Sequence, residues 1–235
     1  MKKTKSFDFK QFKIEGGYSG MPVSTDGVLL GAWANIKQAK TLLDIGTGTG
    51  LLSLMCAQRN SIVDIEAIDI DQHALEAAQF NFEHSLWSER LTLNDGDILC
   101  HDFEHSFDAI ICNPPYFNNG EQAQAKSRAT ARHTDSLRHD DLLKRCMSLL
   151  NEHGKASFVL PKVEGEAFIE IARQQAWTVE RLCYVKPTER KEANRLLIEL
   201  GKSGDKTEYS ELTIHHNGSY SDDFVALTQA FYLKM

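Results

Sequence analysis

Short apolar runs alternate with amphipathic segments along most of this chain. Apolar residues at helical spacing predict helices near residues 51–59, 74–82, 137–150 and 163–175. Runs rich in Leu, Ile, Val and Phe predict strands at 42–45, 63–69, 91–93, 107–112 and 156–160. Strands that alternate with helices are typical of a parallel sheet covered on both faces.

The pattern changes after residue 177. Two strand-like runs, 179–185 and 196–200, have no long helix between them, so we expect them to pair antiparallel at one edge of the sheet. The predicted fold class is therefore α/β, with a doubly wound, mostly parallel, seven-stranded sheet and an antiparallel edge hairpin. Residues 212–215 could form one more strand, and Ser221 precedes a final helix.

The start of the chain does not follow this alternation. We expect residues 1–40 to form an N-terminal extension that packs on the site, and residues 41–235 to form a single globular domain. Within the extension, Thr25 or Asp26 could cap a helix that continues toward Trp33.

Composition narrows the class of protein. The 235 residues include 26 Lys and Arg against 33 Asp and Glu, a net charge of −7, so a polyanionic partner must meet a local basic patch. The lysines near residue 1 are not followed by the uninterrupted apolar core of a secretory signal, and no apolar run is long enough for a membrane helix. The five separated cysteines suit buried, reduced thiols. We expect a soluble, cytoplasmic protein without a metal site, because no His or Cys spacing matches one.

The most informative motif is Asn113-Pro114-Pro115-Tyr116, which follows the expected strand 107–112. Proline cannot donate a backbone hydrogen bond, so the end of this strand leaves carbonyl oxygens without ladder partners. The Asn113 side-chain oxygen and the Pro114 carbonyl can accept both N–H groups of an amine on a planar ring, while Tyr116 offers a stacking face. The motif predicts a site for an exocyclic amine, although Asn-Pro alone is common in turns.

A glycine-rich loop, Asp44-Ile45-Gly46-Thr47-Gly48-Thr49-Gly50, lies between the first expected strand and its helix. Glycines let a backbone approach a ligand closely at a helix N-terminus. Leu51 stands where the dinucleotide fingerprint requires glycine or alanine. The spacing therefore fits a nucleoside with an amino-acid tail better than a dinucleotide.

Two carboxylates follow the next two expected strands. Asp69 can accept hydrogen bonds from both hydroxyls of a ribose. Asp97 can accept one from an adenine amine, while Ile70 and Ile98 pack on the faces of the ring. Each carboxylate could instead cap a helix or loop, and Asp71 could fill that structural role beside Asp69.

Residues 42–50 and 113–116 together resemble the motifs of class I S-adenosylmethionine-dependent methyltransferases that methylate amino groups. The resemblance spans residues 41–200 and implies S-adenosyl-L-methionine as the cofactor. It implies that the glycine loop holds the methionine part, Asp69 the ribose and Asp97 the adenine, and that residues 113–116 hold the acceptor. Asp44 and Asp26 are also predicted cofactor contacts.

Residues 21–33 and 224–235 look similar to the bacterial tRNA(Val) (adenine-37-N6)-methyltransferase family. This narrower resemblance implies that the methyl group goes to the N6 amine of adenine 37 in the anticodon loop of valine tRNA. For tRNA we single out five basic residues, Lys10, Lys13, Arg128, Arg132 and Arg138. We expect the protein to act as a monomer.

Other substrates present similar chemistry. A protein glutamine, an rRNA base or a DNA adenine also offers a planar amine to the Asn113–Tyr116 motif. From a different class, the chain could be an RNA-binding or chaperone module with a vestigial cofactor pocket. A module that only binds has no need for carbonyl groups that orient an amine, which favours an enzyme.

Overall fold

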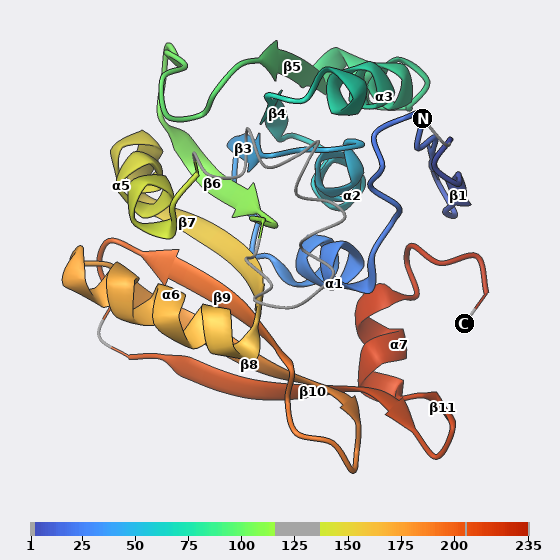
Figure 1. Cartoon of the computed structure of the whole chain (residues 1–235), viewed down its shortest axis with the longest axis vertical. Coiled ribbons are helices and arrows are strands. Elements are labelled where there is room, and N and C mark those ends of the chain that lie inside the picture. Colours follow the sequence, from blue (N-terminus) through green and yellow to red (C-terminus); the bar gives the residue numbers. More distant parts are fainter. Residues whose placement is uncertain (1–2, 116–136, 205, 235) are drawn as a thin grey trace, which may run out of the picture.

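The computed structural model describes residues 3–115, 137–204 and 206–234 (Figure 1). Within these ranges, nine strands form one sheet in the order β11-β10-β8-β9-β7-β6-β3-β4-β5. Their bounds are β3 Thr41–Ile45, β4 Asp64–Asp69, β5 Leu91–Asp95, β6 Phe107–Cys112, β7 Leu150–Pro161, β8 Thr178–Thr188, β9 Arg195–Gly201, β10 Glu208–His216 and β11 Ser219–Tyr220. A separate small sheet pairs β1 Phe7–Asp8 with β2 Lys13–Ile14.

Helices cover both faces of the large sheet, which confirms the doubly wound prediction (Figure 1). They are α1 Thr25–Trp33, α2 Leu51–Arg59, α3 Gln72–Glu83, the short 3₁₀ helix η1 Ser88–Arg90, α5 His139–Leu149, α6 Lys162–Gln174 and α7 Asp222–Thr228. One face packs on α5 and α6, around the buried rings of Phe158 and Phe168. The other face packs on α1, α2 and α7. None of these helices is long and apolar enough to cross a lipid bilayer.

All seven expected strands are present, but the position expected for the hairpin is wrong. β8 and β9 do pair antiparallel, yet β10 pairs parallel with β8 and β11 extends the sheet further. The hairpin therefore lies inside the sheet. β10 is hard to recognise in the sequence because Leu212 is its one buried residue, so it lacks the apolar alternation of a half-buried strand.

The cap of α1 also differs from the expectation. Ser24, rather than Thr25 or Asp26, is the N-cap residue, and its Oγ accepts a hydrogen bond from the Gly27 amide at 3.1 Å. Ser24 has the extended backbone of a cap residue, whereas Thr25 and Asp26 already lie inside the helix. α1 packs against α2 and α7, so this part of the chain belongs to the helical layer.

Cysteine burial is mostly as expected. Cys56, Cys112, Cys146 and Cys183 are buried free thiols, but Cys100 is exposed. Burial raises the pKa of the Cys56 thiol to about 12. Cys100 lies in a loop after β5 rather than in a regular element, which explains why the expectation of burial was wrong for it.

The chain changes direction across the sheet at β3. From β3 it proceeds to β4 and β5 on one side, while β6 and β7 lie on the other side. Ile45, the last residue of β3, is the register partner of Cys112, the last residue of β6. Gly46 and Asn113 therefore start their loops on neighbouring strands, about 5 Å apart. In open α/β sheets, ligands bind at such a switch point.

Candidate active site

The loop after β3 folds over the end of β4. The backbone amides of Gly46 and Thr47 both donate to the Ile68 carbonyl, at 2.9 and 3.1 Å. Gly46, Gly48 and Gly50 have φ values of 67°, 59° and 82°, a region that favours glycine. Gly50 is the N-cap residue of α2. The structure thus brings the three predicted glycines together in one turn at a helix N-terminus.

The surroundings of the three glycines are different. A Cβ atom on Gly48 would lie 3.0 Å from the terminal methyl of Met21, and one on Gly50 would lie 2.5 Å from the Phe82 ring. A Cβ atom on Gly46 would meet no described atom within 4 Å. The space that a ligand can enter therefore lies beside Gly46, where the backbone is bare. This cradle fits the glycine-held part of the predicted cofactor.

Replacing Gly46 by alanine is expected to weaken S-adenosylmethionine binding at least tenfold, because the new methyl group would project into this space. The positive φ adds about 1 kcal/mol of backbone strain. Gly218→Ala is a matched control, since Gly218 also has a positive φ, 82°, with no atom within 4 Å, but lies in the β10–β11 turn. Isothermal titration calorimetry on both variants tests this. Equal cofactor affinities in the two variants would contradict it.

Asp44 lies under the glycine loop and is fully buried. Its Oδ2 accepts hydrogen bonds from the Thr47 hydroxyl at 2.6 Å and from the Ser53 hydroxyl and amide at 2.6 and 3.1 Å. These bonds tie the loop and the first turn of α2 to β3. Its Oδ1 is buried without a hydrogen-bond partner among the described residues. Burial raises the pKa of Asp44 to about 6, although the hydrogen bonds from Ser53 and Thr47 lower it.

The raised pKa of Asp44 gives a stability prediction with a definite sign. The folded chain binds this proton more tightly than the unfolded chain, so the associated stability is present below the ordinary pKa of 3.8 and is lost as pH rises through about 6. Between about pH 5 and about pH 8, the free energy of unfolding should fall by about 1–2 kcal/mol in the native chain relative to Asp44→Asn. Urea unfolding of both proteins measures this difference, and parallel pH profiles would contradict it.

Asp69 connects the end of β4 to the glycine loop. Its Oδ2 accepts from the Gly48 amide at 2.8 Å, and its Oδ1 accepts from the amides of Ile70 and Asp71 at 2.8 and 3.0 Å. The cap of α3 is Asp71, whose Oδ1 accepts from the Ala74 amide at 2.9 Å, so Asp69 is not needed for that role. Burial raises the pKa of the Asp69 carboxyl.

Asp97 lies in the loop after β5, next to the end of β4. The Gly96 amide donates to the Asp69 carbonyl at 3.0 Å, and Asp97 Oδ1 accepts from the Leu99 amide at 2.9 Å. The two isoleucines of the predicted adenine pocket differ in exposure: Ile70 is 42% exposed and Ile98 is 6% exposed. Ile70 can therefore offer a face to a ring, whereas Ile98 packs mainly into the core.

The predicted acceptor motif begins where β6 ends. Asn113 is half-buried, Pro114 is buried and Pro115 is exposed, while Tyr116 lies outside the described residues. The Asn113 Oδ1 atom is buried and has no hydrogen-bond partner among the described residues. An unpaired buried amide oxygen costs about 1–3 kcal/mol. The site therefore favours a ligand that donates a hydrogen bond at this position.

Asp26 has a partner that the sequence did not suggest. Its Oδ2 accepts from the Arg195 Nε at 2.8 Å, and the two residues are 169 positions apart. Arg195 begins β9 opposite Pro161, at the same edge of the sheet as Asn113. The contact joins α1 to the strands beside the acceptor motif. The predicted role of Asp26 as a direct cofactor contact stays a prediction.

Asn81 also supports the glycine loop, although the sequence predicted only that it lies in a helix. It is 3% exposed, and its side-chain amide donates to the carbonyls of Thr49 at 2.8 Å and Glu15 at 3.1 Å. The Glu15 amide donates back to the Asn81 Oδ1 at 2.9 Å. Asn81 therefore braces the glycine loop against the N-terminal segment. The available signal was a polar residue on the apolar side of a predicted helix.

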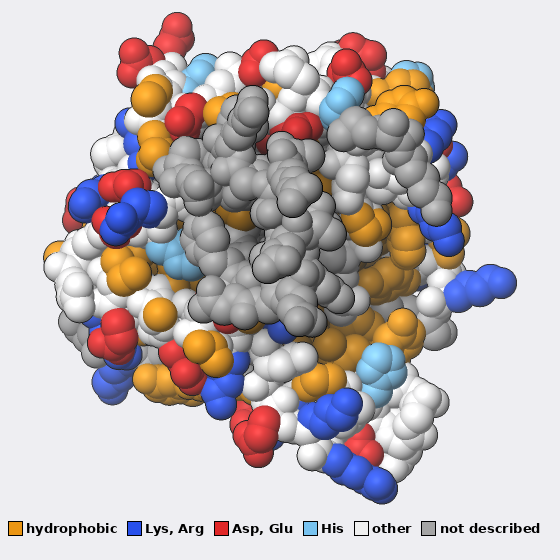
Figure 2. Space-filling model, in the orientation of Figure 1, with side chains coloured by type: hydrophobic (Ala, Val, Ile, Leu, Met, Phe, Trp, Pro, Cys, Tyr) orange, Lys and Arg blue, Asp and Glu red, His pale blue; other side chains and the backbone are white. Residues whose placement is uncertain are grey.

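The basic residues singled out for tRNA already contact the protein where they are described. The Lys10 ammonium donates to the Gln229 carbonyl at 2.6 Å, Lys13 forms an ion pair with Glu15, and Arg138 pairs with Asp140 at 3.0 Å. Arg128 and Arg132 lie outside the described residues. Figure 2 shows blue basic side chains around the rim of one face, interspersed with red acidic ones. In this view the described residues form no single basic patch.

Solved structures with similar folds are methyltransferases. A predicted O-methyltransferase from Agrobacterium tumefaciens superimposes with a TM-score of 0.70 over 88% of this chain and 96% of its own length, at 17% identity. TYW2 from P. horikoshii, solved in complex with MeSAdo, has a TM-score of 0.57 over 83% of this chain and 70% of its own, at 16% identity. These likenesses show the fold, which is that of the Rossmann-like methyltransferases.

Sequence similarity then gives the family. The methyltransferase small domain model matches residues 24–165, and the chain belongs to this family. A relative from Vibrio vulnificus is 62% identical over 233 residues, 99% of this chain and 98% of its own, and is named tRNA1(Val) (adenine(37)-N6)-methyltransferase. One from Aliivibrio fischeri with the same name is 55% identical over 232 residues, 99% of each chain. The predicted enzyme class is confirmed.

Proposed function

We propose that this protein transfers the methyl group of S-adenosyl-L-methionine to the N6 amine of adenine 37 in tRNA1(Val). The single observation that carries the proposal is the register of Ile45 with Cys112, which sets the glycine loop and the acceptor motif side by side. The buried, unpartnered Asn113 Oδ1 supports an amine donor as the ligand at this edge. Relatives of 54–62% identity that bear this name support the choice of nucleotide.

The cofactor half of the site would be formed by the loops after β3, β4 and β5. The loop of Gly46, Gly48 and Gly50 would hold the methionine part against the bare backbone of Gly46, with Gly48 and Gly50 shaping the turn and Asp44 below it. Asp69 would accept from the ribose hydroxyls, and the neighbouring loop would hold the adenine through Asp97, Ile70 and Ile98. When bound, S-adenosylmethionine supplies a sulfonium methyl group that is already strongly electrophilic.

The acceptor half would orient the amine. The Asn113 Oδ1 and the Pro114 carbonyl would each accept one N–H of the adenine amine, and Tyr116 and Pro115 would bound the ring. Two such bonds favour a pyramidal nitrogen, whose lone pair is more available for attack and on which positive charge is stabilised. No strong base is required, because the surplus proton can leave to water after transfer.

Binding of RNA requires the adenine to leave its stack. Extruding a loop base costs a few kcal/mol, and stacking on an aromatic face returns about 1–3 kcal/mol. We propose that Arg128, Arg132 and Arg138, with Lys10 and Lys13, contact tRNA phosphates, and that residues 1–40 pack on the site as an extension of the domain 41–235. We further propose a monomer that acts in the cytoplasm, where its tRNA substrate is found.

The decisive experiment follows the methyl group. The protein is incubated with labelled S-adenosylmethionine and separate pools of total tRNA, rRNA, DNA and protein, and the labelled pool is digested to its monomers. We expect label in N6-methyladenosine from tRNA, and none in a tRNA1(Val) transcript in which adenine 37 is replaced by guanine. Label in protein glutamine, in rRNA or in DNA would select the corresponding rival. No transfer to any pool would contradict an active enzyme.

A further inference from the structure

His139 connects α5 to the acceptor motif. It is the first residue of α5, and its imidazole packs edge-on against the Phe168 ring of α6, with centroids 5.2 Å apart and ring planes at 90°. The imidazole is also hydrogen-bonded to the backbone of Pro115. Proline has no backbone N–H, so the imidazole N–H is the donor and the Pro115 carbonyl is the acceptor. One side chain thus joins the helical layer to the loop after β6.

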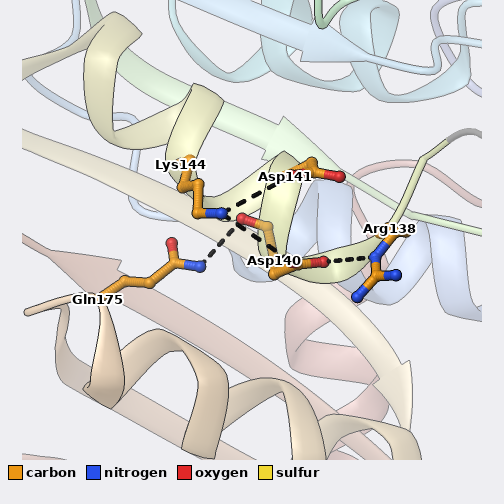
Figure 3. Close-up of polar contacts among 5 residues, drawn as sticks. All are labelled: Arg138, Asp140, Asp141, Lys144 and Gln175. Atoms are coloured by element: carbon orange, nitrogen blue, oxygen red, sulfur yellow. Dashed lines mark hydrogen bonds and ion pairs between the residues drawn. The ribbon is translucent and has the colours of Figure 1, made fainter.

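The first turn of α5 is fixed by several polar contacts (Figure 3). Arg138 and Lys144 pair with the Asp140 carboxylate at 3.0 and 4.0 Å. The Gln175 side-chain amide, at the end of α6, donates to the Asp140 carbonyl at 3.0 Å. His139 directly precedes Asp140, so the hydrogen bond from Gln175 to the Asp140 carbonyl ties the backbone beside His139 to the end of α6. The backbone that carries the His139 imidazole is therefore anchored to α6.

The direction of the Pro115 carbonyl matters for the residues before it. A residue that precedes proline is restricted to an extended backbone, which applies to both Asn113 and Pro114. In an extended backbone, successive residues face opposite sides. Because Pro115 directly follows Pro114, a hydrogen bond that fixes the Pro115 carbonyl also limits the directions in which the Pro114 carbonyl can point. Burial lowers the pKa of His139, which favours the neutral imidazole with its single N–H.

We propose that His139 is a positioning residue for methyl transfer, which holds the Pro115 carbonyl so that the Pro114 carbonyl and the Asn113 amide face the acceptor amine. The inference rests on the proposed function and adds a residue outside the four-residue acceptor motif. His139 itself touches neither substrate in this arrangement. A misplacement of about 1 Å in the groups that orient an amine can cost about a hundredfold in rate.

Three substitutions test the role of the imidazole N–H. His139→Phe keeps a ring against Phe168 and removes the donor, while His139→Asn and His139→Gln each restore a side-chain N–H at a different reach. His84→Phe is the matched control, because His84 also stacks on a phenylalanine, Phe80, at 4.0 Å, but as the C-cap residue of α3, away from the acceptor motif. For each protein we would measure kcat with tRNA, the Kd for S-adenosylmethionine and the melting temperature.

The native chain is assayed first, since absence of transfer to tRNA would overturn the proposed function and this inference with it. We expect His139→Phe to lower kcat by about 10–100-fold, with the Kd for S-adenosylmethionine within about twofold and the melting temperature nearly unchanged. At least one of the two amide variants should recover most of the loss. If the native chain is active, an unaltered kcat in His139→Phe, or no recovery in either amide variant, would overturn the positioning role alone.

Discussion

Replacing Asn113 by alanine is expected to reduce methyl transfer to tRNA by about a thousandfold, while the Kd for S-adenosylmethionine changes by less than about threefold. Removal of one polar group that stabilises developing charge costs about 10²–10³-fold in kcat. The buried Asn113 Oδ1 has no hydrogen-bond partner among the described residues, so no described contact replaces the hydrogen bond that it would accept from the amine. Single-turnover assays at saturating cofactor, together with calorimetric titration of the cofactor, measure the two quantities separately.

Asn151→Ala is the matched control for this experiment. Asn151 donates to Asp108 Oδ1 at 2.7 Å, near the start of β6 and therefore at the opposite edge of the sheet. Its replacement should lower the melting temperature while kcat stays close to the native value. Loss of cofactor affinity in Asn113→Ala would mean that the two halves of the site have been assigned in reverse.

The central strands could be predicted from the sequence because their physical signal is local. β3 and β6 are mostly apolar and mostly buried, as expected for strands covered on both faces, while β4 alternates acidic residues with the buried Ile65, Ala67 and Ile68. The helix expected at 51–59 matches α2 in both bounds. β10 has one buried residue and pairs with β8, although β9 lies between these two strands in the chain, so its place depends on a partner that is not its neighbour in sequence. A local pattern cannot specify such a partner.

The residues of the site also differ in whether a local sequence pattern or a distant strand partner determines their place. The glycine loop and the Asn113–Tyr116 motif each lie on a single segment, and both were recognised from residue type and spacing. Their adjacency depends on the pairing of β3 with β6, and the contact of Asp26 with Arg195 depends on the pairing of β7 with β9. Contacts of this kind appear only when the sheet order is known. The sequence predicted which residues form the candidate site but not the contacts within the protein that hold them.

Asp69→Ala should produce the opposite result from Asn113→Ala. Loss of two charge-assisted hydrogen bonds to a ribose costs about 3 kcal/mol, or about a hundredfold in the Kd for S-adenosylmethionine. The substitution also removes the 2.8 Å hydrogen bond from the Gly48 amide to the Asp69 carboxylate, so the glycine loop loses one of the contacts that hold it. At saturating cofactor, kcat should remain within about tenfold of the native value, because the acceptor half of the site is intact. Titration of the cofactor and assays over a wide range of its concentration test both parts.

Asp71→Ala separates the binding role of Asp69 from a general effect on the end of β4. Asp71 caps α3 through the Ala74 amide at 2.9 Å, and loss of such a cap costs about 0.5–2 kcal/mol of stability. This variant should melt at a lower temperature yet keep the Kd for S-adenosylmethionine. If Asp69→Ala behaves in the same way, with reduced stability and native cofactor affinity, then the Asp69 carboxylate supports the loop alone and the ribose is held elsewhere.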